Sequence, residues 1–336
     1  MLTLTTNGKV YTGFSTIDFF TSMNAVASSC YLRFKMDSKL MSNIEILKDH
    51  EVQISIKNKK ILTGYVDAIE KEFNAESNQM HIYIRSKQSD LVDCSLISDP
   101  GEFKNQSLKE IITKFVSPFG ISLISEVGDG GVFDKWSVTP GETVWENIEK
   151  ATRIKGLLLV GDINGNLKLI TPGKEQEKTQ LIENLNIVEA SQKSDNTRRY
   201  SNYIVKGQSP DLITDAIGET KDASIKRYRP LLIFSEAPVN ISGARKRAEW
   251  ENIIRAMRGE DLTITVNDWL TSPDGSHWET NKRTKVISPT LGIKEEYLIT
   301  TIRYYSNEDR FPKTEIGLER IDSFIPTNSV NEKAKR

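Results

Sequence analysis

The chain has 336 residues, of which 45 are lysine or arginine and 46 are aspartate or glutamate. This length usually corresponds to about two to three domains, because one hydrophobic core seldom spans so many residues. The net charge of -1 argues against a protein that wraps nucleic acid by bulk attraction, and it leaves open the passage of DNA through a neutral channel.

Cys30 and Cys94 are the two cysteines of the chain. They imply no disulfide framework, and we expect two buried, reduced thiols rather than a Cys30–Cys94 bridge. The first ten residues alternate as in a polar strand and lack the apolar region of a signal peptide. No apolar run approaches the roughly 20 residues that a membrane span needs. The sequence therefore predicts a soluble protein, made in the cytoplasm, without a membrane anchor or a secretion signal of its own.

The first hundred residues carry the pattern of antiparallel strands. Asn7-Gly8, flanked by Leu2–Thr5 and Val10–Phe14, is a strong hairpin signal. Successive strands joined by short turns are typical of a barrel or a sandwich. Alternation, together with a polar turn at Asn58-Lys59-Lys60, predicts further strands at Ser29–Lys35, Val52–Ile56, Ile61–Phe73 and Met80–Ile84.

The period then changes to that of helices. Ser107 and Glu110 form a capping box at the start of a helix that runs to Val116, and Pro118 with Gly120 ends it. These residues predict the first element of an α/β insert.

A second helix of the insert is predicted with Thr139 as N-cap, Pro140 at its first position and Glu142 at its third. Gly156 is expected to end this helix. A hairpin around Asn164-Gly165 follows and joins residues 157–160 to residues 167–170.

From Ile187 the strand pattern returns, through Tyr203 and Val205, and residues 211–222 predict a polar loop. A helix is expected over Ser242–Arg258. The last strands are predicted at Leu262–Val266, Thr284–Ile287, Tyr297–Tyr305 and Lys313–Arg320. Residues 327–336 lack apolar anchors and predict a frayed tail.

The sequence predicts no catalytic, cofactor or metal site. His50, His81 and His277 are too scattered for a metal motif, and we expect each at the surface or at a sheet edge. Gly128–Gly131 follows no buried strand and opens no helix, which favours a flexible loop over a phosphate cradle.

Other polar clusters also have simpler explanations. Asp162, Asn164 and Asn166 begin like a calcium loop, but Leu167 and Gly173 stand where that loop needs glycine and glutamate, so a tight turn is favoured. The acidic pairs Glu70/Glu72 and Glu295/Glu296 have no spacing that would hold two carboxylates on opposite sides of a cleft, as a glycosidase needs. The basic cluster Arg245–Arg247 is expected to be a solvated helix face, with contact to an acidic partner as the alternative. The dispersed tryptophans are expected to be packing residues: Trp136, Trp145, Trp250, Trp269 and Trp278.

Three segments carry a family resemblance. They are TGYVD at Thr63–Asp67, KQSDLVDCS at Lys87–Ser95 and RYRP at Arg227–Pro230, with the helix-to-hairpin stretch Thr139–Ile170 between the second and the third. In this order and spacing they resemble the baseplate hub proteins of Mu-like contractile-tailed phages. That family includes late-control D-type tail proteins and the hub portion of VgrG.

The resemblance implies a mainly β fold with two tail-tube-like β-barrel domains and a smaller α/β insert. It implies a structural homotrimer without catalytic activity, which joins the sixfold tail tube to the threefold central spike around an open channel. The expected domains are residues 1–97 with completion by 182–208, the insert 98–181, residues 209–326 with a helix near 242–258, and the tail 327–336.

The partners that the resemblance implies are tail tube or distal tail proteins, the spike, baseplate wedge proteins and, in the channel, the tape measure protein or DNA. Because no spike or lysozyme domain precedes the end near Arg336, the spike is expected to be a separate protein. The hub of a tailocin or of a type VI-like secretion apparatus remains an alternative. A tail-associated cell-wall hydrolase is the alternative of a different class, and it would need a Glu-Asp or Cys-His pair in a cleft.

Overall fold

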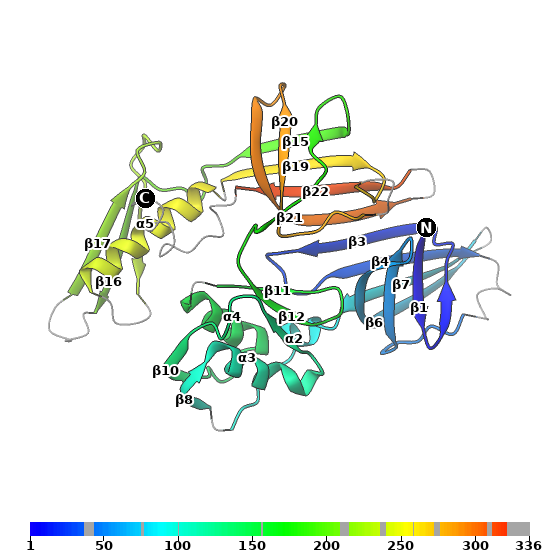
Figure 1. Cartoon of the computed structure of the whole chain (residues 1–336), viewed down its shortest axis with the longest axis horizontal. Helices are drawn as coiled ribbons and strands as arrows, with labels where there is room; N and C mark the ends of the chain where they lie inside the picture. The colour runs from blue at the N-terminus through cyan, green and yellow to red at the C-terminus, as the bar shows by residue number, and fades with distance from the viewer. Residues whose placement is uncertain are drawn as a thin grey trace.

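The computed structural model describes residues 1–36, 44–74, 77–99, 101–155, 157–208, 215–235, 240–257, 259–271, 276–307 and 311–320. Strands dominate the regular structure, and the helices lie in two smaller parts (Figure 1). The mainly β fold with smaller α/β parts that the sequence predicts is confirmed.

The N-terminal strands follow the predicted pattern. Leu4 pairs with Tyr11 across the first hairpin, and Asn7 and Gly8 both have positive φ, as a type I′ turn requires. The next turn lies at Lys57-Asn58, also with positive φ, one residue before its predicted place. The seven strands are β1 (Leu2–Thr6), β2 (Lys9–Tyr11), β3 (Thr16–Ser22), β4 (Ser29–Met36), β5 (Glu51–Ile56), β6 (Lys59–Phe73) and β7 (Asn78–Ser86).

The C-terminal strands join the N-terminal ones in a single 14-stranded sheet. The junction is the antiparallel pair β3–β21, where Tyr304 lies opposite Phe19 and their rings stack with centroids 5.6 Å apart. Buried residues from both sets of strands, from Leu2 to Leu318, form one continuous hydrophobic cluster. The C-terminal strands are β13 (Glu175–Gln176), β14 (Leu181–Ile182), β15 (Ile187–Ser194), β19 (Glu260–Asn267), β20 (Lys282–Ser288), β21 (Ile293–Ser306) and β22 (Lys313–Glu319).

The structure corrects the prediction that residues 182–208 complete the N-terminal set. β14 pairs with β20, and β15 pairs with β19, so both belong to the C-terminal strands. Residues 202–208 lie in a separate three-stranded sheet. Alternation along a strand reveals which face is buried but not which distant strand lies beside it, and this is why the sequence placed these strands wrongly.

The insert unit, residues 89–170, has its own buried cluster, which includes Leu91, Ile112, Ile148 and Leu169. The predicted capping box is confirmed, since the Ser107 N–H donates to Glu110 Oε2 at 2.7 Å and the Glu110 N–H to Ser107 Oγ at 3.2 Å. The unit comprises α2 (Ser89–Asp93), β8 (Glu102–Ser107), α3 (Leu108–Val116), the 3-10 turn η1 (Ser117–Phe119), β9 (Leu123–Ser125), β10 (Val132–Ser137), α4 (Val144–Ile154), β11 (Leu158–Gly161) and β12 (Leu167–Ile170).

The predicted start of α4 at Thr139 is wrong by four residues. Thr143 and Glu146 form the box instead, with the Thr143 N–H 2.7 Å from Glu146 Oε2 and the Glu146 N–H 3.1 Å from Thr143 Oγ1. The buried Asn147 side chain accepts from the Thr139 N–H and donates to the Thr143 carbonyl, which holds residues 139–143 as a loop. The predicted helix end at Gly156 lies outside the described residues.

A small α/β unit, residues 196–257, lies at one end of the molecule (Figure 1). Its sheet has the order β17-β16-β18 and consists of β16 (Asn202–Gln208), β17 (Asp215–Lys221) and β18 (Pro230–Phe234). The helix α5 (Ile241–Met257) packs on this sheet and not on the C-terminal strands with which the sequence grouped it. The predicted loop over 211–222 is also corrected, because its described part, 215–221, is β17. The predicted tail, 327–336, lies outside the described residues.

Candidate functional site

A hollow of about 690 Å³ lies where the N-terminal strands, the insert hairpin and the C-terminal strands meet. Lys282 pairs with Glu279 across its wall, at 3.1 Å. Burial, together with the charge of Lys59, lowers the pKa of His277, which also lines the hollow. Among the described residues of this wall, no nucleophile is hydrogen-bonded to a base that a third group orients, the arrangement that nucleophilic catalysis uses.

The three histidines have separate structural surroundings. His50 Nδ1 is 3.3 Å from Asn7 Nδ2, and His81 Nδ1 is 2.7 Å from the Tyr31 hydroxyl. Of the two positions expected for His277, the surface is excluded, since this residue is 8% exposed; it forms an isolated bridge with Leu270 outside the named strands. Within the described ranges, no group of three His, Cys, Asp or Glu side chains is placed to hold a metal ion.

The acidic candidates are occupied by local contacts. Asp162 Oδ1 accepts the N–H groups of Asn164 and Asn166, at 2.9 and 2.8 Å, which confirms the predicted tight turn. Glu70 accepts from the Tyr83 hydroxyl, Glu72 lies 3.7 Å from His81, and Glu295 and Glu296 pair with Arg320 and Arg283.

The glycine-rich loop packs against α3 instead of projecting freely. The Leu108 N–H donates to the Gly131 carbonyl at 2.9 Å, and the Lys109 N–H donates to the Asp129 carbonyl at 3.1 Å. Two donors of the first helical turn are therefore already satisfied by backbone oxygens and are not free for a phosphate. The basic cluster on α5 is solvated as predicted, with Arg245 and Arg247 paired to Glu249 and Glu251 one turn on.

The family segments meet at the junction between the N-terminal strands and the insert unit. Arg85 on β7 binds both Asp67 of the first segment and Asp93 of the second, with Nη2 2.6 Å from Asp93 Oδ2. The hydrogen bond from Arg85 lowers the pKa of Asp93. The sequence reasoning missed Arg85, although an arginine two residues before the second segment was a signal for such a bridge.

Gln88 fixes the insert hairpin to the same junction. Its side chain is fully buried, and Nε2 donates to the carbonyls of Asn166 at 2.7 Å and Asp162 at 3.2 Å. Thr63 Oγ1 donates to the carbonyl of Ile163 at 3.0 Å. Three carbonyls of the β11–β12 turn are thus bound by side chains of the first and second segments.

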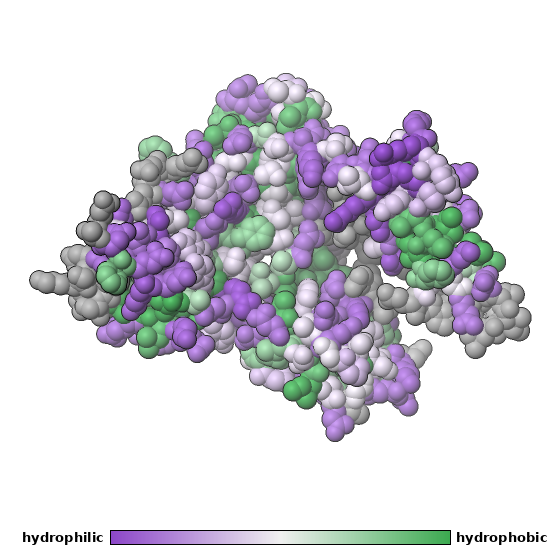
Figure 2. Space-filling model, turned by 180° about the vertical axis from the view of Figure 1, so that it is seen from behind, coloured by the Kyte–Doolittle hydropathy of each residue, from purple (hydrophilic) through white to green (hydrophobic). Residues whose placement is uncertain are grey.

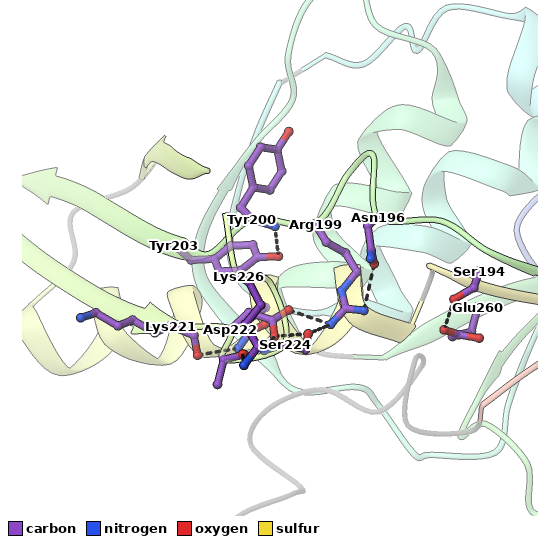
Figure 3. Close-up of polar contacts among 12 residues, drawn as sticks. Ser194, Asn196, Arg199, Tyr200, Tyr203, Lys221, Asp222, Ser224, Lys226 and Glu260 are labelled. Atoms are coloured by element: carbon purple, nitrogen blue, oxygen red, sulfur yellow. Dashed lines mark hydrogen bonds and ion pairs between the residues drawn. The ribbon is translucent and has the colours of Figure 1, made fainter. Parts of the chain in front are cut away.

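The junction at which the chain enters the small α/β unit, residues 195–201, is held by Arg199 (Figure 3) and by the third segment. Arg199 Nη2 lies 2.8 Å from Asp222 Oδ2 and 2.5 Å from Ser224 Oγ, and the Arg199 and Asp222 side chains are 15% and 8% exposed. Arg229 of the segment donates from Nη2 to the Thr197 carbonyl at 2.6 Å.

Carboxylates set the electrostatics of this junction. Burial acts to raise the pKa of Asp222, but hydrogen bonds from Ser224 and Arg199 outweigh it, and the pKa lies below its ordinary value. The Thr197 N–H, 2.7 Å from Asp195 Oδ1, lowers the pKa of Asp195 to about 2. Both groups therefore stabilise the junction as anions at neutral pH.

Apart from the strands β2, β13 and β14, which have two or three residues each, two described strand segments of the large sheet have an open edge. Beyond an isolated bridge between Glu183 and Ile187, β15 pairs with β19 alone among the described residues. Residues 67–73 of β6 likewise pair with β7 alone. Most residues of both segments are exposed, Val188 at 47% and Phe73 at 87%. Open edges are surfaces on which another chain can pair, so they are the candidate assembly sites of the fold.

The chain matches three models of baseplate protein domains. Residues 1–86 match the N-terminal domain of Mu phage baseplate assembly protein GpP-like proteins, residues 88–171 the second domain of baseplate hub protein gp44-like proteins, and residues 240–327 the fourth domain of GpP. These stretches account for most of the chain.

Individual relatives agree over nearly the full length. The chain is 24% identical to baseplate hub protein gp44 of Escherichia phage Mu over 99% of its own length and 92% of that protein. The 43 kDa tail protein of prophage MuSo2 from Shewanella oneidensis superposes with a TM-score of 0.88 at 28% identity, covering 97% of this chain and 99% of the other. A tail protein from Neisseria meningitidis, 19% identical, has the same fold with a TM-score of 0.85 over 97% and 98% of the two chains.

The helices of the described residues include none long and apolar enough to cross a membrane. The matches over the whole chain, and not a catalytic arrangement, identify a structural component of the virion tail. The chain belongs to the baseplate hub proteins of Mu-like phages.

Proposed function

We propose that three copies of this chain close into a ring at the baseplate, where they join the sixfold tail tube to the threefold central spike around an open channel. As a baseplate hub protein, the chain associates with other tail and baseplate proteins. The proposed partners are baseplate wedge proteins outside the ring and, inside the channel, the tape measure protein or DNA in transit. Synthesis in the cytoplasm of the host belongs to the same proposal.

The observation that carries the proposal is the pair of open edges at different places in one sheet. β15 is at one end of the strand order, and residues 67–73 of β6 extend past β5 with β7 as their one partner among the described residues. An interface between two different patches of identical chains is heterologous, and it closes into a ring when the rotation between copies allows. Pairing of β15 with the β6 edge of the next copy would cover both edges in every copy.

Charge permits this association. The net charge of -1 produces little repulsion between copies, and a channel without strong positive charge would not retain DNA by phosphate contacts. Under this proposal the chain divides into the two sets of strands that build the ring and two peripheral parts, the insert unit and the small α/β unit.

The test is the mass of the purified chain by light scattering, combined with cryo-electron microscopy of the particle. We expect a trimer on the tail axis. Val188→Lys places a charge on the β15 edge and is expected to weaken the trimer at least tenfold, whereas Ile97→Lys, at a residue of the insert unit that is 95% exposed, serves as the control. A wild-type monomer both in solution and in the particle, or a position away from the tail axis, would overturn the proposal.

A further inference from the structure

The small α/β unit has one covered face and one open face. Tyr203 and Val205 on β16 are fully buried with Ala244 and Ala248 of α5. Because side chains alternate along a strand, Ile204 and Lys206 lie on the opposite face of the sheet. No described helix covers that face.

Strand register gives the open face a defined pattern. Lys206 lies between Ile217 of β17 and Phe234 of β18, and Ile204 lies next to Leu232 of β18. Ile217, Leu232 and Phe234 are 43%, 47% and 70% exposed. Figure 2 shows an apolar area on this unit, on the side of the molecule turned away in Figure 1. We call these five residues the open face.

The unit is attached to the rest of the chain as an arm. Its strands and helix pack on one another, and none packs extensively against the large sheet or the insert unit. The contacts to the remainder run through the connecting segments, such as the Asp195 N–H to the Gly259 carbonyl at 2.7 Å. The unit lies at one end of the molecule (Figure 1), where the open face packs against no other described element. Within the unit, the Arg199–Asp222 pair ties the entering segment to the residue that follows β17 (Figure 3).

The charge of the small α/β unit indicates which partner binds its open face. Residues 196–257 contain 11 lysines and arginines and 7 aspartates and glutamates, whereas the rest of the chain has 34 of the former and 39 of the latter. Lys206, Lys221 and Arg227 make no ion pair within the described part of the chain. These three cations outnumber the two carboxylates of β17, Asp215 and Glu219. A basic arm with exposed apolar residues is complementary to the acidic remainder of a second copy.

We propose that the open face docks on the acidic remainder of the neighbouring copy, so that each copy extends its small α/β unit over the next one. This rests on the ring assembly proposed above and adds a second contact to the strand edges. Phe234 is the apolar anchor, and Lys206 supplies the charge beside it. Apolar anchors ringed by polar groups typically carry much of an interface energy.

The test replaces Phe234 by the photoreactive amino acid p-benzoylphenylalanine. Unlabelled and ¹⁵N-labelled chains are mixed under dissociating conditions, reassembled and irradiated. The expected product is a cross-link between a labelled and an unlabelled copy, from position 234 to a peptide outside residues 196–257. Cross-links confined to one copy, or between two copies of the open face, would overturn the inference, as would the absence of any cross-link in a sample that light scattering shows to be trimeric.

Matched variants give an independent measurement. Phe234→Asp and Lys206→Glu are each expected to raise the trimer dissociation constant at least tenfold, while Lys246→Glu, on the exposed side of α5, leaves it unchanged. Unchanged hydrogen exchange of α5 would show that the unit still folds. If both open-face variants keep the trimer dissociation constant of the wild type, the inference is wrong and the proposed function is unaffected. If the wild type is a monomer, both the inference and the proposed function are wrong.

Discussion

Gly218 on β17 touches the backbone of α5 at Ala244. A Cβ at position 218 would lie 2.2 Å from the Ala244 carbonyl carbon and 2.0 Å from the Arg245 nitrogen, well inside van der Waals contact. Only a residue without a side chain allows the helix to lie this close to the sheet. The packing of the small α/β unit therefore depends on this one position.

Gly218→Ala is expected to destabilise the unit by about 1–3 kcal/mol, because the helix must move away from the strand to admit the methyl group. Hydrogen exchange should report faster exchange of α5 amides, while amides of β4 and β7 keep their protection. Gly101→Ala is the control, since a Cβ there meets nothing within 4 Å and its φ is not in the left-handed region. Equal protection of α5 in both variants would contradict the tight contact.

The two cysteines should differ sharply in reactivity. Cys30 is 1% exposed in the core, and burial raises the pKa of its thiol, whereas Cys94 is exposed; both are free, so the expected buried position is wrong for Cys94. A thiol reagent should label one thiol of the native protein and two after denaturation, because the thiolate is the reactive form. Cys94→Ser should abolish the native labelling. A Cys30–Cys94 disulfide in non-reduced peptides would refute the prediction.

Local patterns in the sequence predicted local structure well. Alternation identified β4, β5 and β7, and the Ser107–Glu110 box identified the start of α3, because both signals depend on neighbours in the chain. The start of α4 was predicted wrongly because Thr139-Pro140 and Thr143 offer competing caps. The choice between them is made by the buried Asn147 side chain.

Long-range relations were not predictable in this way. Whether β15 pairs with the N-terminal or the C-terminal strands depends on residues more than 65 positions away, such as Glu260 opposite Ser194. The junctions were found only in part: the family segments supplied Asp67 and Asp93, but Arg85 between them became apparent only when the strands were placed together.

The insert hairpin is expected to depend on Gln88. Gln88→Ala removes the donor to two carbonyls of the β11–β12 turn and should destabilise the docked hairpin by about 1–3 kcal/mol, since buried acceptors would lose their partner. Limited proteolysis within residues 157–170 measures the effect. Gln53→Ala, at an exposed position of β5, should change nothing. Equal cleavage rates in the two variants would show that Gln88 does not hold the hairpin.

The junction of the small α/β unit should loosen in acid. The pKa of Asp222 is lowered in the folded state, and that of Asp195 is lowered to about 2. A lowered folded pKa means that the stabilisation is fully present above the unfolded value of about 3.9 and is lost as the pH falls through the folded value. The junction should therefore weaken between about pH 4 and pH 2.

Asp222→Asn separates this effect from general acid unfolding. The variant leaves the largely buried Arg199 guanidinium without its anion, which should cost about 3 kcal/mol at pH 7. Because the wild-type carboxylate is itself neutralised in acid, the difference between wild type and variant should shrink as the pH falls below 4. Thermal unfolding from pH 7 to pH 2.5 measures this difference, with Asp215→Asn, an exposed residue of β17, as the control. A difference that stays constant over this range would mean that the Arg199–Asp222 pair does not govern the acid response of the junction.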